Sequence, residues 1–470
     1  MTTVRKTAAA LLASAALAGC TMIPTYERPA APVADAFPYP AATEGTPAAA
    51  LDWQQFFADP KLRSLITTAL SNNRDLRVAV LNIEQARAQY QIRRADIYPN
   101  VGLGVGASRA PSPVNGNETT TYQAGFTLSL WEIDLFGRLR SLSEAAVAQY
   151  LATEEGRKAA QTTLVSSIAN TWLGLVADEE LLVLTQDTLR SRQETLRLTK
   201  LRFDNGVSSE LDFRLAQSLF ESARVSLSQQ QRQRALDLNT LALLVGQPLP
   251  TDFSTGTTMA AVALPDVPAG LPSQVLVARP DVRQAEQQLL SANANIGAAR
   301  AAFFPRITLT ASAGRASSQL SGLFNGNGDF AYTVAPQLLL PIFEGGRNIA
   351  GLRSANVQRD IAIAQYERAI QQAFKDVSDA LAGRNTLTDQ LQAQVNVAQA
   401  ESVRTRLTQL RYDAGVASSL DLLDAQRSLF TARQGEIQTR LARLQNQVLL
   451  YRALGGGWTE PAATAGAQAR

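Results

Sequence analysis

Hydrophobic residues recur with a helical period over most of this chain. A run from about 137 to 203 contains no proline and is compatible with helix throughout, and a second helical run extends from about 346 to 412. A shorter helical stretch doubles back after each run, the first at about 210–244 and the second ending near Gly455. At about 1.5 Å per residue, the first run would reach roughly 100 Å as one helix. Such length without breakers favours coiled-coil packing over a compact globule.

Four short segments alternate with a period of two instead. In the first, Val101, Leu103 and Val105 alternate with glycines. This pattern predicts strands with one apolar face and one small or polar face. The strands are expected at about 100–108, 121–131, 306–314 and 330–340. A helical stretch precedes each pair, at about 60–95 and 273–302, and ends before Pro99 or Pro305 because proline disfavours helix in the residue before it.

The chain repeats itself. Residues 201–224 read LRFDNGVSSELDFRLAQSLFESAR, and residues 410–433 read LRYDAGVASSLDLLDAQRSLFTAR, aligned without a gap. Duplication on this scale predicts two copies of one large unit. We expect an extended N-terminal segment at 20–60, followed by repeat 1 at 61–250 and a linker at 251–270. Repeat 2 should then occupy 271–455, and a flexible tail 456–470. Function should then come from the architecture rather than from one catalytic cluster.

The N-terminus has the features of a secretory signal. Residues 1–19 contain Arg5 and Lys6, followed by an apolar stretch too short to span a membrane. The sequence Leu17-Ala18-Gly19-Cys20 resembles a bacterial lipobox, which predicts cleavage before Cys20 and a covalent N-terminal lipid on that residue. A chance cysteine after an ordinary signal is the alternative. Thr21, rather than aspartate, favours the outer membrane over the inner membrane.

Composition excludes several classes of protein. Cys20 is the only cysteine, so disulfides and cysteine-rich metal sites are excluded. The formal net charge of +3 becomes +1 when Arg5 and Lys6 leave with the signal (3 − 2 = 1), and nothing calls for nucleic acid. The chain has no histidine, the usual general base and the commonest metal ligand. We expect no enzyme activity, no metal and no cofactor beyond the lipid.

Four strands cannot close a barrel, and open strand edges are not tolerated in lipid. A membrane-spanning sheet would therefore need several chains, and three chains would supply twelve strands. The apolar faces would meet lipid and the small or polar faces the lumen, as in an outer-membrane barrel. The long helices are too polar to cross a bilayer and would project into the periplasm. The alternative is that the strands form one side of a soluble sandwich.

Four segments, CTMIPTYERP, ARAAFFPRITL, PQLLLPIFEGGR and LRYDAGVASSLDLLDAQRSLF, resemble the TolC-like outer-membrane efflux proteins, and most closely their lipidated OprM-like branch. The resemblance covers about residues 20–455. It implies an α+β homotrimer, in which a 12-stranded transmembrane β-barrel continues into a 12-helix periplasmic α-barrel.

By this resemblance the chain is the outer-membrane channel of a tripartite pump that exports small molecules from a Gram-negative bacterium. Its partners would be a periplasmic adaptor, an inner-membrane pump of the resistance-nodulation-division class, and outer-membrane lipid. Two alternatives remain: a duct for type I protein secretion, and a lipoprotein scaffold that conducts nothing.

Two turns join the long helices to their return helices, and we call them tip 1 (residues 203–212) and tip 2 (residues 412–421). Gly206 and Gly415 suit the left-handed position that ends a helix. In each tip a serine and an aspartate follow, Ser209 with Asp212 and Ser418 with Asp421, spaced like a capping box. Capping alone would explain both aspartates without any gate.

The second return helix carries the candidate gate. Asp421, Asp424 and Arg427 are three residues apart and share one side of it. The resemblance maps a closed periplasmic aperture onto Leu420, Asp424 and Arg427, with Asp421 and Tyr412 as further matches. Asp212 of tip 1 is a further candidate gate residue. The alternative for Asp424 and Arg427 is a surface ion pair worth roughly 0–1 kcal/mol. Ala417 stands where some members of the family carry arginine, so we expect Tyr412 to lack that partner.

The resemblance also places adaptor docking in grooves around the two tips. The candidate docking residues are Gly206, Val207, Ser208, Gly415, Val416 and Ala417. Because the two tips are similar but unequal, an adaptor could bind in two ways around a trimer.

Overall fold

The computed structural model describes residues 21–39, 46–111, 116, 118–270 and 279–458. The predicted signal peptide, Cys20 and residues 459–470 of the predicted tail lie outside these residues. The chain divides into two compact units. The first comprises Met1–Ala31, Leu81–Glu154 and Gln284–Arg368, and the second comprises Pro32–Val80, Glu155–Arg283 and Ala369–Arg470.

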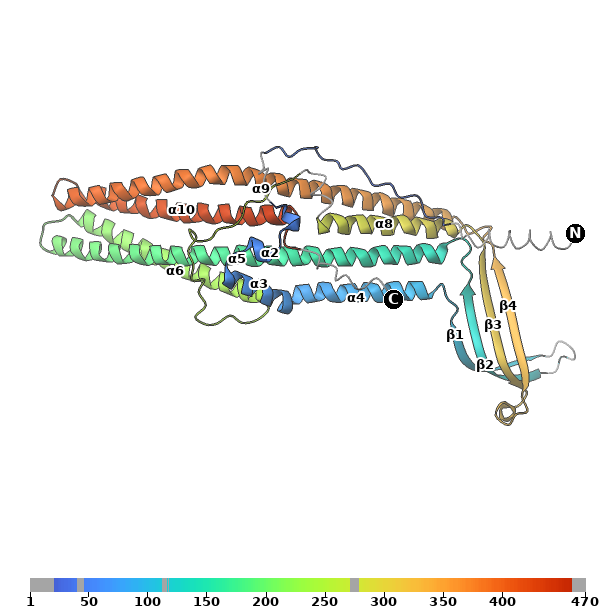
Figure 1. The fold of residues 1–470 in the computed structure, drawn as a ribbon. Coiled ribbons are helices and arrows are strands. Elements are labelled where there is room, and N and C mark those ends of the chain that lie inside the picture. The colour runs from blue at the N-terminus through green and yellow to red at the C-terminus, as the bar shows by residue number, and fades with distance from the viewer. Residues whose placement is uncertain (1–20, 40–45, 112–115, 117, 271–278, 459–470) are drawn as a thin grey trace. The chain divides into compact units, whose positions relative to one another are not determined.

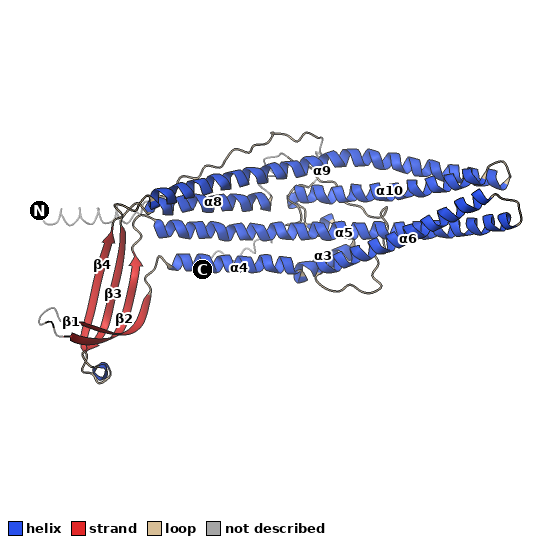
Figure 2. Cartoon of the chain, turned by 180° about the vertical axis from the view of Figure 1, so that it is seen from behind, coloured by secondary structure: helices blue, strands red, loops and turns tan. Residues whose placement is uncertain are grey.

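The first unit contains one antiparallel sheet in the order β1-β2-β3-β4 (Figures 1 and 2). Its strands are β1 (Val101–Pro111), β2 (Glu118–Glu132), β3 (Arg306–Ser317) and β4 (Asp329–Leu339). Apolar side chains on the two edge strands are exposed, with Leu103 76% and Phe330 74% accessible. An open sheet with an uncovered apolar face and two free edges is incomplete as a soluble structure.

Strand β2 contains an irregularity that the alternating pattern does not predict. Its register with β3 shifts between Leu128 and Trp131, and Leu130 has a φ of 49°. The shift interrupts the predicted alternation of Leu128 and Leu130, because a bulge places an extra residue on one strand. The indole N–H of Trp131 then donates to the Ile97 carbonyl at 3.0 Å, which ties the end of β2 to the segment that precedes β1.

The N-terminal segment of the first unit lies along helix α8 (Pro280–Ala301). The Asn293 side chain donates to the Pro24 carbonyl at 2.8 Å, and Arg28 donates two hydrogen bonds to Glu286 at 2.7 and 3.0 Å. A Cβ added at Gly297 would lie 2.6 Å from the Ile23 side chain. Any side chain larger than that of glycine at this position would therefore collide with Ile23.

Long helices form two hairpins whose tips belong to the second unit. Helix α5 (Arg138–Asp204) is followed by α6 (Glu210–Val245), and α9 (Arg347–Asp413) is followed by α10 (Ser419–Ala453). Within the described residues, no helix has the length and apolar content that crossing a bilayer requires.

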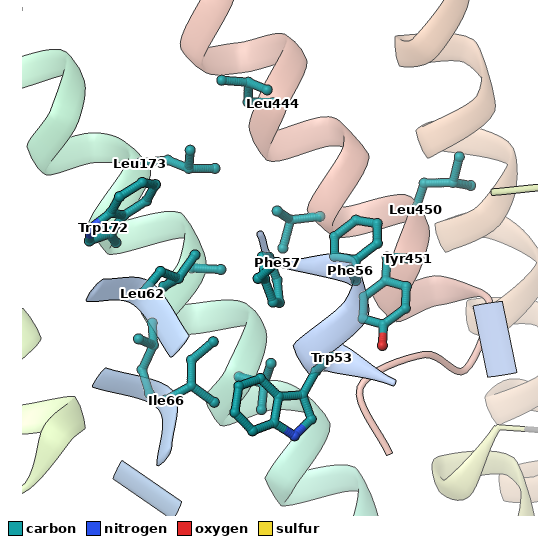
Figure 3. Packing of buried hydrophobic residues seen from close by; sticks show 14 of the residues in the cluster. Trp53, Phe56, Phe57, Leu62, Ile66, Trp172, Leu173, Leu444, Leu450 and Tyr451 are labelled. Carbon is teal, nitrogen blue, oxygen red and sulfur yellow. The ribbon is translucent and has the colours of Figure 1, made fainter. Parts of the chain in front are cut away.

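Aromatic side chains join the N-terminal helix α2 (Trp53–Phe56) to the hairpins in the core of the second unit (Figure 3). Phe56 stacks on Tyr451 of α10 with ring centroids 3.9 Å apart and an interplanar angle of 6°. Trp172 of α5 is fully buried in the same cluster. Burial of such rings stabilises the fold through both apolar area and ring stacking.

The predicted helix at about 60–95 is in fact two helices, α3 (Pro60–Asn72) and α4 (Arg74–Ala95). Asn73 separates them in an extended conformation. Its side-chain amide donates to the Leu244 carbonyl at 2.9 Å, and its side-chain oxygen accepts from the Leu76 N–H at 2.9 Å. The asparagine thus caps the new helix and satisfies a carbonyl of α6, which compensates for the interrupted helical hydrogen bonds.

Candidate functional site

The two tips have the same backbone geometry. Gly206 and Gly415 have φ of 73° and 75°. In each tip the N–H after the glycine returns to a carbonyl five residues earlier, Val207 to Arg202 at 2.8 Å and Val416 to Arg411 at 2.9 Å. This is the Schellman pattern of a helix end, which satisfies carbonyls that the last turn leaves free.

Each return helix begins with a capping box. The Ser209 hydroxyl accepts from the Asp212 N–H at 3.1 Å, and the Ser418 hydroxyl accepts from the Asp421 N–H at 3.2 Å. The Ser418 hydroxyl and N–H, led by the hydroxyl, hold the pKa of Asp421 below its usual value. Among the described residues, the Asp421 side chain forms its hydrogen bonds with Ser418, which is the capping interaction.

Asp212 differs, because it also joins the two hairpins. Its second carboxylate oxygen accepts a hydrogen bond from the Ser419 hydroxyl of α10. This contact is the first cause of a lowered Asp212 pKa, followed by the hydrogen bond from Ser209. Ser208 donates to the same carboxylate at 3.3 Å. The capping interpretation therefore accounts for only one of the two oxygens of Asp212.

Tyr412 makes a second contact between the hairpins. Arg202 of α5 donates to the Tyr412 hydroxyl, and its guanidinium lies 5.4 Å from the centre of the Tyr412 ring. Ala417 cannot provide such a partner, but Arg202 does from the other hairpin. The sequence analysis did not select Arg202, although an arginine precedes the aromatic residue in both repeats, Arg202 before Phe203 and Arg411 before Tyr412.

Asp424 lies between two arginines. Arg427 of the same helix approaches one carboxylate oxygen at 2.5 Å, and Arg404 of α9 approaches the other at 2.7 Å. The hydrogen bond from Arg404 is the first cause of a lowered Asp424 pKa. The sequence analysis missed Arg404. A signal was present, because Arg404 and Asp424 lie on opposite sides of tip 2, ten residues before and ten residues after Ala414, and an antiparallel hairpin brings such positions together.

Apolar side chains project from the tips and the adjoining helix. Val207 is 74% exposed and Val416 67% exposed, while Leu420 is also exposed and Ser208 and Ala417 are half-buried. A groove of about 930 Å³ follows α9 towards tip 2. Its lining is mainly apolar, with arginines on it, and includes Val403, Leu407, Leu410, Val416, Arg404 and Arg411.

No group of three or more histidine, cysteine, aspartate or glutamate side chains suited to a metal ion occurs in the described ranges. What the tips present is instead a set of hydrogen bonds and ion pairs between two hairpins, beside an exposed apolar groove.

Comparison with known proteins extends over nearly the whole chain. The family described as "Outer membrane efflux protein" matches residues 65–247 and 271–456, two segments close to the two repeats. The chain is 46% identical over 464 residues, covering 96% of each protein, to the probable efflux pump outer membrane protein TtgC of Pseudomonas putida. It is 42% identical, again covering 96% of each, to the outer membrane protein OprJ of Pseudomonas aeruginosa.

Solved structures agree with these matches. The open state of the Neisseria gonorrhoeae MtrE outer membrane channel aligns with a TM-score of 0.85 and 41% identity, covering 93% of this chain and 98% of that one. CusC aligns with a TM-score of 0.83 and 38% identity, covering 93% of this chain and 100% of that one. These likenesses confirm the predicted TolC-like resemblance and the α+β class, and the chain belongs to the outer membrane efflux protein family.

Proposed function

We infer that this chain is the outer-membrane channel of a tripartite efflux pump. The observation that carries the inference is the combination, in one chain, of an open apolar sheet and two long helical hairpins, shared almost end to end with an outer membrane channel. Relatives over the same length are named as efflux pump outer membrane proteins. Members of this family are channel proteins, and the described tips present contacts between helices rather than a metal centre.

We propose that three copies complete the membrane-spanning part. The edge strands β1 and β4 run antiparallel in the sheet order, so β4 of one copy can pair with β1 of the next. Three copies then give twelve strands without a free edge. The exposed apolar face, which includes Leu103 and Phe330, would lie against lipid.

We propose that the tips close the periplasmic end. Around a threefold axis, three Asp424 carboxylates with their arginines would form a charged ring, and Leu420 would narrow the opening beside it. The contacts from Arg202 to Tyr412 and from Ser419 to Asp212 support this proposal, because they join the hairpins that opening would separate. Asp421 is assigned to capping in each chain, and any role in the gate would require a neighbouring copy.

The finer partner assignments are also proposals. A periplasmic adaptor would dock at the tips, with the groove beside Val416 as one of two similar but unequal surfaces. The inner-membrane partner would be a pump of the resistance-nodulation-division class, and the cargo would be small molecules. A lipid on Cys20 would anchor the chain in the outer membrane of a Gram-negative bacterium.

Planar-bilayer conductance of the detergent-purified protein tests the channel and the gate together. We expect brief, small openings for the wild type and large, long openings for Asp424→Ala/Arg427→Ala, because the variant removes the ion pairs of tip 2. We expect Arg404→Ala to have an intermediate effect, since Arg427 still contacts Asp424.

The matched control is Glu210→Ala/Arg214→Ala, which removes an exposed pair from the start of α6. Its conductance should equal that of the wild type. Large steady currents from every protein would retain the channel and reject the gate. Folded protein that conducts in no variant would favour a scaffold instead.

A further inference from the structure

A cleft of about 440 Å³ lies between the two hairpins, and its lining mixes polar and apolar side chains without including Arg404, Asp424 or Arg427. Helices α5, α9 and α10 supply its lining, and all the lining residues belong to the second unit. Each helix contributes one arginine, Arg192 from α5, Arg406 from α9 and Arg433 from α10. Hydroxyl groups of Ser191 and Ser402 lie among them.

Arg192 is the deepest of the three and is only 5% exposed. It donates one hydrogen bond to the Leu219 carbonyl at 2.9 Å and lies 5.4 Å from the centre of the Phe430 ring. Burial lowers the pKa of Arg192, and no carboxylate among the described residues offsets that effect. A buried cation without a counter-ion is costly, so such a residue usually has a specific partner.

The surroundings do not supply the missing negative charge. Within the residues that the structure describes, Arg406 and Arg433 have no acidic partner either. The one carboxylate lining the cleft, Asp187, is paired with Arg190 at 3.3 Å. Three guanidinium groups from three helices thus face one cleft without neutralisation.

One acceptor in the cleft also lacks a partner. The side-chain oxygen of Gln426 is buried and receives no hydrogen bond from the described residues. A ligand that accepts hydrogen bonds from the guanidinium groups and also donates one to Gln426 would satisfy the unpaired groups of the residues that line this cleft. A fully ionised anion such as sulfate meets only the first requirement, whereas a hydrogen phosphate group meets both.

We propose that this cleft binds a small oxyanion that retains an O–H, of the hydrogen phosphate class. Its ionised oxygens would accept from Arg192 and from at least one of Arg406 and Arg433, since guanidinium and phosphate form strong paired hydrogen bonds. Its O–H would donate to Gln426. Binding forms and breaks no covalent bond.

Because the cleft lies between the two hairpins, a bound anion would affect the opening of the channel. This step rests on the proposed channel function. Arg192 belongs to the first hairpin, whereas Arg406 and Arg433 belong to the second. A bound anion would hold the hairpins together from within, and without it the three like charges oppose their approach. Phosphate should therefore favour the closed tip.

Isothermal titration of inorganic phosphate into the detergent-purified full chain at neutral pH tests the site directly. We expect saturable binding of about one phosphate per chain, and at least about tenfold weaker binding in Arg192→Gln, because a hydrogen bond to a charged group is removed. Arg197→Gln is the matched control, since Arg197 lies on the same helix, is exposed and pairs with Glu194 at 2.6 Å. The control should bind phosphate as the wild type does.

Three outcomes would overturn the proposal. They are no phosphate binding by the wild type, equal losses in Arg192→Gln and Arg197→Gln, and sulfate binding as tight as phosphate binding. If Arg192→Gln does not fold, Arg406→Gln/Arg433→Gln decides instead, because both side chains are exposed. Unchanged phosphate affinity in that double variant would reject the site.

Binding and conductance fail independently in this design. Phosphate should reduce the open probability of the wild type at constant chloride, and Arg192→Gln should lose that response. If the protein binds phosphate but never conducts, the anion site is supported and the channel function is refuted. If it conducts but binds no phosphate, the channel function is supported and the anion site is refuted.

Discussion

Tip 1 and tip 2 share their backbone but differ in their charges. Both have a left-handed glycine, the same returning hydrogen bond and the same capping box. Where tip 2 is followed by Asp424 and Arg427, repeat 1 has Leu215 and Ser218 at the equivalent positions, and Thr195 stands in place of Arg404. The duplicated sequence thus preserves the turn itself, whereas the ion pairs of Asp424 with Arg404 and Arg427 belong to one copy.

The aromatic residues diverge in the same way. Phe203 stacks on Phe213 within the first hairpin, with centroids 5.5 Å apart. Its counterpart Tyr412 reaches Arg202 of the other hairpin instead. Repeat 2 has Leu422 at the position of Phe213, and the Tyr412 hydroxyl gives the ring a partner in the other hairpin instead. Small changes on a repeated turn therefore give the two tips different contacts.

Transferring the charges of repeat 2 to repeat 1 gives the largest expected effect. We expect Thr195→Arg/Leu215→Asp/Ser218→Arg to reduce the open probability several-fold in bilayers, because three copies would gain a second set of ion pairs, each individually modest. Ser218→Arg alone adds charge without a partner and is the control. A triple variant that conducts like the wild type would show that the network in repeat 2 does not hold the tips.

Acid should weaken the contact between the tips. The pKa of Asp212 is lowered in the folded chain, so its stabilising contribution is present above the unfolded value of about 3.9 and is lost as pH falls through the folded value. Ser419→Ala removes the first cause of that shift. Because the variant lacks this contact at every pH, we expect it to open more often than the wild type at neutral pH and to show a smaller acid-induced increase in conductance.

The matched comparison for this effect is Ser418→Ala, which removes a hydroxyl from Asp421 rather than from Asp212. Because Asp421 makes its hydrogen bonds with Ser418 and not with the other hairpin, this change should leave the contact between Ser419 and Asp212 in place. Identical pH profiles for Ser418→Ala and Ser419→Ala would contradict a special role for Asp212.

The smallest effect should be the same at both tips. Removing the capping hydroxyl by Ser209→Ala or Ser418→Ala should each cost about 1 kcal/mol of stability, the usual loss for a helix N-cap. Chemical denaturation of the purified protein, followed by its helical circular dichroism, would measure the two losses. Unequal losses of stability would show that the two capping boxes are not energetically equivalent despite their shared backbone geometry.

Local signals in the sequence predict the tips well. Gly206, Ser209 and Asp212 define a helix end and a helix start within a few residues, and the structure has both. The contact of Arg404 with Asp424 lies within one hairpin and could have been found from antiparallel pairing. The contact of Arg202 with Tyr412 depends on which hairpins lie side by side, which no short motif encodes. The break at Asn73 was missed for a similar reason, since it depends on the Leu244 carbonyl far along the chain.

The bulge at Leu130 shows another limit. Alternation predicts which face of a strand is apolar, but an extra residue changes the phase without changing the composition. Leu130 is a leucine in a conformation that favours glycine, so its identity gives no warning. The sequence therefore predicts the existence of β2 and the character of its faces more reliably than its register near Leu130.

The seating of Ile23 beside Gly297 also determines how a lipid on Cys20 would act. Arg300 donates to the Met22 carbonyl at 3.3 Å, so the seated part of the segment begins only two residues after Cys20. Two residues span at most about 7 Å. An acyl chain attached there would be a short tether, so it would hold the start of the seated segment close to the bilayer surface. It would thereby set the height of α8 relative to that surface.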